Sequence, residues 1–311
     1  MSIMTIVYII LALVLVVNGA FGILFARDLA KNRGTVMKEP GNPIALAILS
    51  PIIFFFSTFG ISDFAVASAI YPKLKWVDPK RLPGTLNTQC AIPVAFMALF
   101  FIRTIEVGIW TLVIAIAMQI IGSYVSPRFV VKLPAKQIKI FISIGLLIAS
   151  VMITFRLIGF MPSGENMYYL TGWRLAVLAI AMFVFGALNN LGIGSYSLTM
   201  AAVYALGLSP AIAFPIMMGA CTFSVPVGGM EFLRFENSYS RKITLFTSTF
   251  GILGVLLATR LYGQLNLYHL TLVVIAVIFY SAVTMIMSVV KDGKAEADEE
   301  VADVPEEEEV S

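Results

Sequence analysis

Small and hydroxylated residues interrupt two long apolar stretches of the sequence. The stretch 44–72 is broken by Phe-Gly-Ile-Ser-Asp at 59–63, and the stretch 174–206 is broken by Asn-Asn-Leu-Gly-Ile-Gly-Ser at 189–195. The glycines Gly60 and Gly192 lie 132 residues apart. At each break the backbone must leave the helix within an apolar environment, which frees its polar groups for other partners.

The residue types at the two breaks can hold an anion without a basic side chain. The half-helix that follows a break points free N–H groups and partial positive charge toward it. Glycine permits unusual backbone angles and lets a ligand approach the backbone. Two such helix N-termini facing each other would form an anion site. We therefore expect a cradle made by Gly60, Ser62, Gly192, Gly194 and Ser195.

Further polar residues in each half could complete this cradle. Asn87 and Thr88 follow the first break, and Thr222 follows the second, each by about one helix length. In one interpretation they donate hydrogen bonds to the ligand. In the other they form hydrogen bonds between helices, and Ser62 and Ser195 are simply N-caps. Both interpretations stay open at the level of the sequence.

Asp63 is an ionisable residue within an apolar stretch, which makes it a functional candidate. An ionised carboxylate would repel an anion, so its functional role would be proton coupling, with the carboxyl protonated when substrate is bound. The other interpretation is a cap of the half-helix that follows the break, and the sequence favours it.

The remaining side chains leave little room for metal, redox or enzymatic chemistry. The chain has two cysteines, Cys90 and Cys221, and one histidine, His269, with no Cys-x-x-Cys motif. The apolar stretches hold no paired carboxylates and no nucleophile–base pair. We therefore expect no metal, no cofactor and no enzymatic activity, and we expect both cysteines to be buried free thiols.

Composition indicates a membrane protein. Hydrophobic residues make up 59% of the chain and charged residues 13%, whereas a soluble domain has about a quarter charged residues. Nearly every charge falls between apolar runs of about 20 residues, the length that spans a bilayer as a helix. The sequence therefore predicts an all-α polytopic membrane protein surrounded by lipid, with no nucleic-acid partner. The nine apolar runs are 4–26, 44–72, 84–102, 105–126, 138–160, 174–206, 211–232, 243–262 and 267–290.

Loop charges favour a re-entrant path for the two broken stretches. If all nine runs crossed the membrane, the 21 basic residues would divide twelve against nine. If 44–72 and 174–206 each enter and leave on one side, seventeen basic residues share one face and four share the other. The second distribution is the one expected of a cytoplasmic face. It gives seven transmembrane helices and two re-entrant elements, each made of two half-helices of about 20 Å.

This arrangement divides the chain into two halves of opposite orientation. Residues 1–43 form the first span and a cytoplasmic loop, 44–160 form repeat 1, and 174–290 form repeat 2. Each repeat has one re-entrant element and three spans, and the odd number of spans inverts the second repeat. Residues 291–311 form an acidic, disordered cytoplasmic tail.

A weak internal repeat agrees with this division. At an offset of 132 residues Gly60-Ile61 matches Gly192-Ile193, Gly122 matches Gly254, Arg128 matches Arg260, and Leu133 matches Leu265.

The stretch 185–264 resembles the second half of the sulfite exporter TauE/SafE family of membrane permeases. The resemblance rests on Gly-Ala-Leu-Asn-Asn-Leu-Gly-Ile-Gly at 186–194, Leu-Gly-Leu-Ser-Pro at 206–210 and Gly-Ala-Cys-Thr at 219–222. The first half follows the family pattern more loosely, and Ser62-Asp63 stand where the family has glycines. The chain thus resembles a divergent member of the family.

The resemblance implies a secondary transporter that exports or exchanges a small anion, such as sulfite or a sulfonate, across the cytoplasmic membrane. Alternating access at a midplane site would move the anion. The alternative is a non-transporting membrane sensor or assembly subunit with a degenerate site. Whether the chain forms a homo-oligomer is left open.

Overall fold

The computed structural model describes residues 3–104, 107–134, 167–208 and 212–262, with scattered positions in 136–160 and 279–290. These residues are mainly helical and form no β-strand, only an isolated bridge between Met167 and Leu208. Six helices are long and apolar enough to cross a membrane. The prediction of an all-α, multi-pass membrane protein is therefore confirmed.

Several predicted features fall beyond this part of the chain. The expected spans 138–160 and 267–290 lie largely outside the described residues, and His269 and the acidic tail 291–311 lie wholly outside them.

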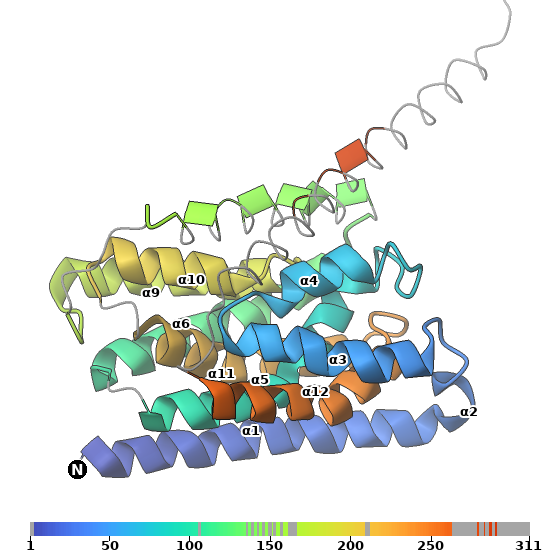
Figure 1. Ribbon diagram of the computed structural model, residues 1–311, viewed down its shortest axis with the longest axis horizontal. Helices are drawn as coiled ribbons and strands as arrows, with labels where there is room; N and C mark the ends of the chain where they lie inside the picture. The colour runs from blue at the N-terminus through green and yellow to red at the C-terminus, as the bar shows by residue number, and fades with distance from the viewer. Residues whose placement is uncertain are drawn as a thin grey trace, which may run out of the picture.

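The long helices lie side by side along one axis, with α1 at one edge (Figure 1). The six candidate spans correspond to the helices α1 (Ile3–Lys31), α5 (Leu82–Thr104), α6 (Ile109–Val125), α9 (Gly172–Asn189), α11 (Ala213–Phe232) and α12 (Arg241–Leu261). The shorter helices are α2 (Arg33–Val36), α3 (Pro43–Thr58), α4 (Asp63–Ile70), α7 (Pro127–Val130) and α10 (Ser195–Ala205).

The stretch 44–72 is a broken helix, and its first arm ends in a Schellman motif. The Gly60 N–H donates to the Ser57 carbonyl at 2.9 Å, and the Ile61 N–H donates to the Phe56 carbonyl at 3.3 Å. Gly60 has a φ of 86°, a left-handed conformation in which a Cβ would be strained. The chain leaves α3 here and starts α4.

The stretch 174–206 is broken by the same motif. The Gly192 N–H donates to the Asn189 carbonyl at 3.1 Å, and the Ile193 N–H donates to the Leu188 carbonyl at 3.2 Å. Gly192 has a φ of 90°. Each of these four residues lies 132 positions after its counterpart in the first break.

The two arms of each broken helix differ in length. The first arms have 16 residues in α3 and 18 in α9, or about 24 and 27 Å. The second arms have 8 residues in α4 and 11 in α10, or about 12 and 16 Å. The expectation of equal half-helices of about 20 Å is therefore wrong. Each Schellman glycine lies past the middle of its apolar stretch, which lengthens the first arm at the expense of the second.

The first broken helix returns to the end of the bundle where it starts. The Trp76 ring, just after α4, lies beside Gly41, just before α3. The side chain of Arg81, in the loop before α5, forms an ion pair of 3.0 Å with Glu39. The loop 73–83 therefore lies beside the loop before α3, as the re-entrant arrangement requires.

The second broken helix starts and returns at the opposite end. Met167, before α9, and Leu208, after α10, form the isolated β-bridge. The Gly108 N–H, between α5 and α6, donates to the Tyr168 carbonyl at 2.7 Å. Because α5 runs about 34 Å away from the Arg81 end before it reaches Gly108, the two broken helices enter from opposite ends.

Packing between the two halves of the chain follows one pattern. Helix α3 packs against α12, and α9 packs against α6. Helix α5 packs against α12 and against α11, while α11 also packs against α6. The centre of the bundle is formed by α5 and α11, whose candidate spans are the most buried of the six. This arrangement surrounds the ends of the short arms with protein rather than lipid.

Candidate functional site

The two breaks meet inside the bundle. A Cβ placed on Gly194 would collide with the Ser62 hydroxyl and would lie 3.0 Å from the Phe64 Cβ. Ser62 is 2% exposed, so the contact is buried. Gly194 lies 132 positions after Ser62, so equivalent positions of the two breaks touch each other. The N-termini of α4 and α10 are thus brought together, and we call the residues 60–64 and 192–196 the first and second tip.

In the first tip, Ser62 caps α4 and Asp63 does not. The Ser62 Oγ accepts from the Ala65 N–H at 3.4 Å. The Asp63 carboxylate, 1% exposed, accepts instead from the Ser57 hydroxyl at 3.2 Å. The cap interpretation that the sequence favoured for Asp63 is therefore wrong, because the preceding serine already accepts the hydrogen bond of the free N–H group.

In the second tip, the corresponding positions are joined in a similar way. The Ser195 N–H donates to Asn189 Oδ1 at 3.2 Å. The Ser195 hydroxyl lies 3.2 Å from Cys221 Sγ of α11 and 3.5 Å from Gln119 Nε2 of α6. Ser57 and Asp63 in the first tip are thus matched by Asn189 and Ser195 in the second, each pair six residues apart.

Side chains of four helices surround the tips. Cys90 of α5 lies beside the Asp63 carboxylate, and Tyr196 of α10 lies near it from the second tip. The Tyr71 hydroxyl, after α4, donates to Gln89 Oε1 at 2.6 Å. Cys90 and Cys221 are buried free thiols, as predicted.

Several buried polar atoms at the tips have no hydrogen-bond partner. Such an atom costs about 1–3 kcal/mol when it stays unpaired, so a cluster of them indicates room for a small polar ligand or water. Lysine and arginine are absent from both tips. The unpaired atoms are Asp63 Oδ2, Ser68 Oγ, Gln89 Nε2, Gln119 Oε1 and Tyr196 Oη.

Of the predicted residues outside the tips, one contacts a tip. Asn87 exchanges hydrogen bonds with Asn189, through Nδ2 to the Asn189 carbonyl at 3.4 Å and through Oδ1 from Asn189 Nδ2 at 3.3 Å. Gly60 and Gly192 shape the breaks themselves through their positive φ angles.

Thr88 and Thr222 instead connect helices. The Thr88 hydroxyl lies 2.7 Å from the Thr244 hydroxyl of α12. Thr222 Oγ1 accepts from Asn18 Nδ2 of α1 at 3.1 Å. These contacts match the second interpretation that the sequence left open, hydrogen bonding between helices.

Sequence reasoning missed Ser57, Gln119 and Tyr196 at the tips. Ser57 has a signal in the sequence, because it lies 132 positions before Asn189 and six before Asp63. Gln119 has none, because nothing in the α6 sequence shows which residue of another helix it faces.

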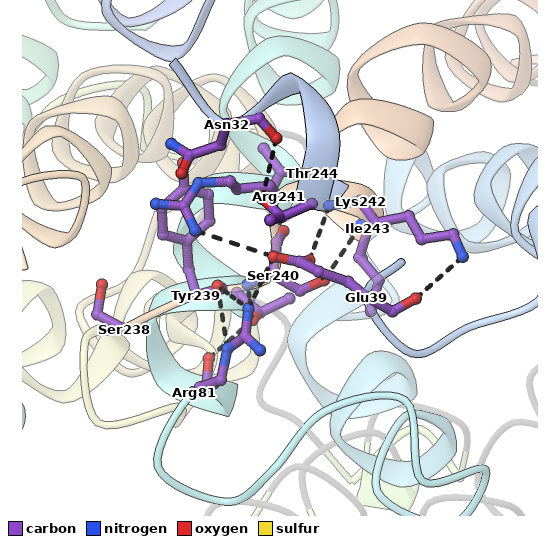
Figure 2. A network of polar contacts seen from close by, with 12 residues as sticks. Asn32, Glu39, Arg81, Ser238, Tyr239, Ser240, Arg241, Lys242, Ile243 and Thr244 are labelled. Carbon is purple, nitrogen blue, oxygen red and sulfur yellow. Dashed lines mark hydrogen bonds and ion pairs between the residues drawn. The ribbon is translucent and has the colours of Figure 1, made fainter. Parts of the chain in front are cut away.

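A second polar cluster closes the end of the bundle where α3 starts (Figure 2). Glu39 accepts from Arg81 Nη2 at 3.0 Å, from the Ser240 hydroxyl at 2.8 Å and from the Lys242 N–H at 3.1 Å. The Lys242 ammonium donates to backbone carbonyls on both sides of Glu39, at Met37 and Gly41. This end network ties the loop before α3 to the start of α12.

Asp28 of α1 extends the end network. Its carboxylate accepts from Arg241 Nε at 2.6 Å and from the Tyr239 hydroxyl. Burial, followed by this hydrogen bond, raises the pKa of Tyr239 well above its usual value. The phenol therefore stays protonated and continues to donate to Asp28.

Metal chemistry has little support in the structure. No three histidine, cysteine, aspartate or glutamate side chains within the described ranges lie close enough together to hold a metal ion.

Comparisons with known proteins return no match: no family model, no curated protein and no solved structure is similar to this chain at a significant level. The geometry of the tips, rather than any relative, carries the functional argument.

Proposed function

We propose that this protein is a secondary transporter of a small anion, with its binding site where the two tips meet. The observation that carries the proposal is the buried contact between Ser62 and Gly194. It brings two helix N-termini together, and glycine-interrupted segments in matching positions of two halves are typical of secondary transporter sites. Movement of one half against the other around this point would expose the site to each side in turn.

We further propose that the two halves form an inverted repeat. Three features 132 residues apart support it: the Schellman motifs, the contact between equivalent tip positions, and the match of Gly122 with Gly254. The packing of α3 on α12 and of α9 on α6 fits the same relation. Because the broken helices return to opposite ends of the bundle, the relation inverts the second half relative to the first.

The end network faces the cytoplasm in this proposal. It joins the loops that carry most of the basic residues, which the positive-inside rule assigns to that side. At the opposite end four aromatic side chains are more than half exposed, as in the aromatic belt of a membrane interface. They are Trp110, Tyr168, Tyr169 and Trp173.

The substrate class follows from the chemistry of the tips. Helix N-termini and hydroxyl groups bind anions by N–H and O–H donation. With no basic side chain at either tip, a buried Asp63 must be protonated when the anion is bound, so the same residue would couple transport to protons. Together with the resemblance to the TauE/SafE permeases, this favours sulfite or a small sulfonate.

Flux of labelled sulfite into proteoliposomes tests the proposal. The Gly194→Val variant fills the contact between the tips and should abolish flux while the protein stays folded. Gly19→Val is the matched control, because a Cβ at Gly19 meets nothing within 4 Å. If folded wild-type protein moves neither sulfite nor sulfoacetate, the proposal is wrong.

A non-transporting sensor is the second candidate, and an aromatic cluster beside the first tip favours it. The Tyr262 ring packs on those of Phe59, Phe100, Phe101 and Phe214, with centroids 5.1–6.2 Å apart. Such a cluster could seal one route to the site permanently. Thermal stabilisation by sulfite without any flux would favour this function.

A further inference from the structure

A row of buried polar side chains leads away from the second tip between α6 and α11. Gln119 Nε2 of α6 donates to the Ser224 hydroxyl of α11 at 2.9 Å. One turn further along α6, the Ser123 hydroxyl donates to the Ser224 carbonyl at 2.6 Å. Ser126 continues the same face of α6, because residues four and three apart lie above one another on a helix.

Asn190, just before the second tip, fills the middle of this row. Its Nδ2 donates to the Ser123 carbonyl and to the Ser126 hydroxyl, each at 2.7 Å. Gly228 of α11 leaves the space for these groups, since a Cβ there would lie 2.6 Å from Asn190 Oδ1 and 2.7 Å from Ser123 Oγ. The row therefore lies on the side of α11 that has no side chain at this level.

Glu231 lies one turn beyond Gly228 and connects the row to the surface. Its side chain is 5% exposed and forms ion pairs with Arg234 at 2.7 Å and Arg128 at 3.7 Å. Those two arginine side chains are 67% and 50% exposed. This end of α11 precedes the loop that carries Tyr239, so it belongs to the same side as the end network.

The unpaired atoms along this route are acceptors. Asp63 Oδ2 at the first tip, Gln119 Oε1 and Asn190 Oδ1 are buried without a hydrogen-bond donor. An anion offers no proton to such an atom, whereas water or a protonated carrier does. Buried water typically bonds to polar groups that have no other partner.

We propose that this row is a hydrated path along which the Asp63 proton reaches the cytoplasmic end of the bundle. The proposal rests on the transport function proposed above. The proton leaves Asp63 Oδ2, passes along waters held by Gln119 and Asn190, and reaches Glu231 or the water beside it. Asp63 is left as a carboxylate, so the step needs no further reactant.

The groups that face Asp63 are compatible with this transfer. Ser57 donates to it from α3, and the titratable groups near it are Cys90 of α5, Tyr196 of α10, Cys221 of α11 and Tyr71 after α4. Each of these is uncharged in its protonated form. Among the described residues no basic side chain pairs with Asp63, so its charge depends on gaining or losing a proton.

The interface of α5 with α12 provides a matched control. There Thr244 pairs with Thr88 and also donates to the Ser240 carbonyl at 2.9 Å, so its hydroxyl is fully bonded. Like Ser123, Thr244 is a buried hydroxyl residue between two packed helices, yet it does not lie along the row.

The first experiment measures hydration without any need for transport. Ser123→Cys and Thr244→Cys are introduced into a chain that lacks Cys90 and Cys221, and inverted vesicles are treated with a small methanethiosulfonate reagent. The cysteine at 123 should react from the cytoplasmic side faster than the one at 244 by an order of magnitude. Equal rates would overturn the proposal, whether or not the protein moves sulfite.

The second experiment separates the proton from the anion. In proteoliposomes containing a pH-sensitive dye, Asn190→Leu should keep sulfite exchange, while the proton movement that accompanies net sulfite flux falls by an order of magnitude. Thr244→Val should keep both. Gly228→Ala is the second variant if Asn190→Leu fails to fold, because its methyl group enters the same space. Unchanged proton movement in a folded variant would refute the path, whereas loss of sulfite flux in the wild type would refute the transport function instead.

Discussion

Gly254 of α12 lies directly against the backbone carbonyl of Pro51 in α3. The same contact occurs between Gly122 of α6 and the Phe183 carbonyl of α9, and both members lie 132 positions from their counterparts. Small residues let helices approach closely in membranes, where packing rather than the hydrophobic effect holds them together. These two glycines therefore set the distance between each broken helix and its neighbour.

Replacing either glycine should loosen the bundle. We expect Gly254→Val and Gly122→Val to lower stability by about 1–3 kcal/mol each, because a side chain would press on a backbone carbonyl that cannot move aside. Thermal unfolding in detergent measures the effect. Gly19→Val, at an open position, should leave the unfolding temperature nearly unchanged. Equal effects at all three positions would contradict the close packing.

Removing the charge of Asp63 should remove the coupling to protons. The isosteric Asp63→Asn variant keeps a group that can accept from Ser57, as the carboxylate does at 3.2 Å. We expect its sulfite flux to become independent of pH. The measurement is flux at a series of pH values in wild-type and variant proteoliposomes. A variant with the pH profile of the wild type would exclude a coupling role.

Removing the Lys242 ammonium should detach the loop before α3 from α12. Lys242 is 4% exposed, and its Nζ donates to the carbonyls of Met37, Glu39 and Gly41. The Lys242→Met variant would leave these acceptors unpaired, so we expect a loss of about 3 kcal/mol in stability. Lys38→Met, which removes an exposed ammonium from the same loop, is the control and should have little effect.

Alkaline pH should weaken the end network through Tyr239. Its pKa is raised in the folded protein, so the phenol contributes its full stabilisation below the usual tyrosine pKa of about 10. The contribution is lost as the pH rises above that value, because the unfolded chain ionises first. Unfolding temperatures measured from neutral to alkaline pH should fall more steeply for the wild type than for Tyr239→Phe. Parallel curves would show that the hydrogen bond to Asp28 does not contribute.

Labelling of the loops should separate the re-entrant arrangement from nine full crossings. Lys38→Cys and Lys75→Cys flank the first broken helix, and both positions are exposed. We expect an impermeant thiol reagent to label both from the cytoplasmic side. Tyr169→Cys, 63% exposed at the opposite end, should be labelled only from outside. Labelling of positions 38 and 75 from different sides would show that 44–72 crosses the membrane.

The sequence by itself determined the features that depend on local physics. Apolar run length shows which segments enter a bilayer, and a glycine in the left-handed conformation ends a helix whatever surrounds it. The breaks at Gly60 and Gly192 and the side on which each loop lies could therefore be predicted from composition and charge. The equal length expected for the two arms was wrong, because the glycines, not the ends of the apolar runs, decide where each arm stops.

Only the tertiary structure decided which polar groups face one another. Ser62 rather than Asp63 caps α4, and Thr222 bonds to Asn18, 204 residues away. Gln119 finds Ser224 across 105 residues, and Gly194 finds Ser62 across 132. A side chain in an apolar helix shows its type but not its partner, because the partner is fixed by how helices pack. The site and the proton path are made of such long-range pairs, which exist only once the two halves have come together.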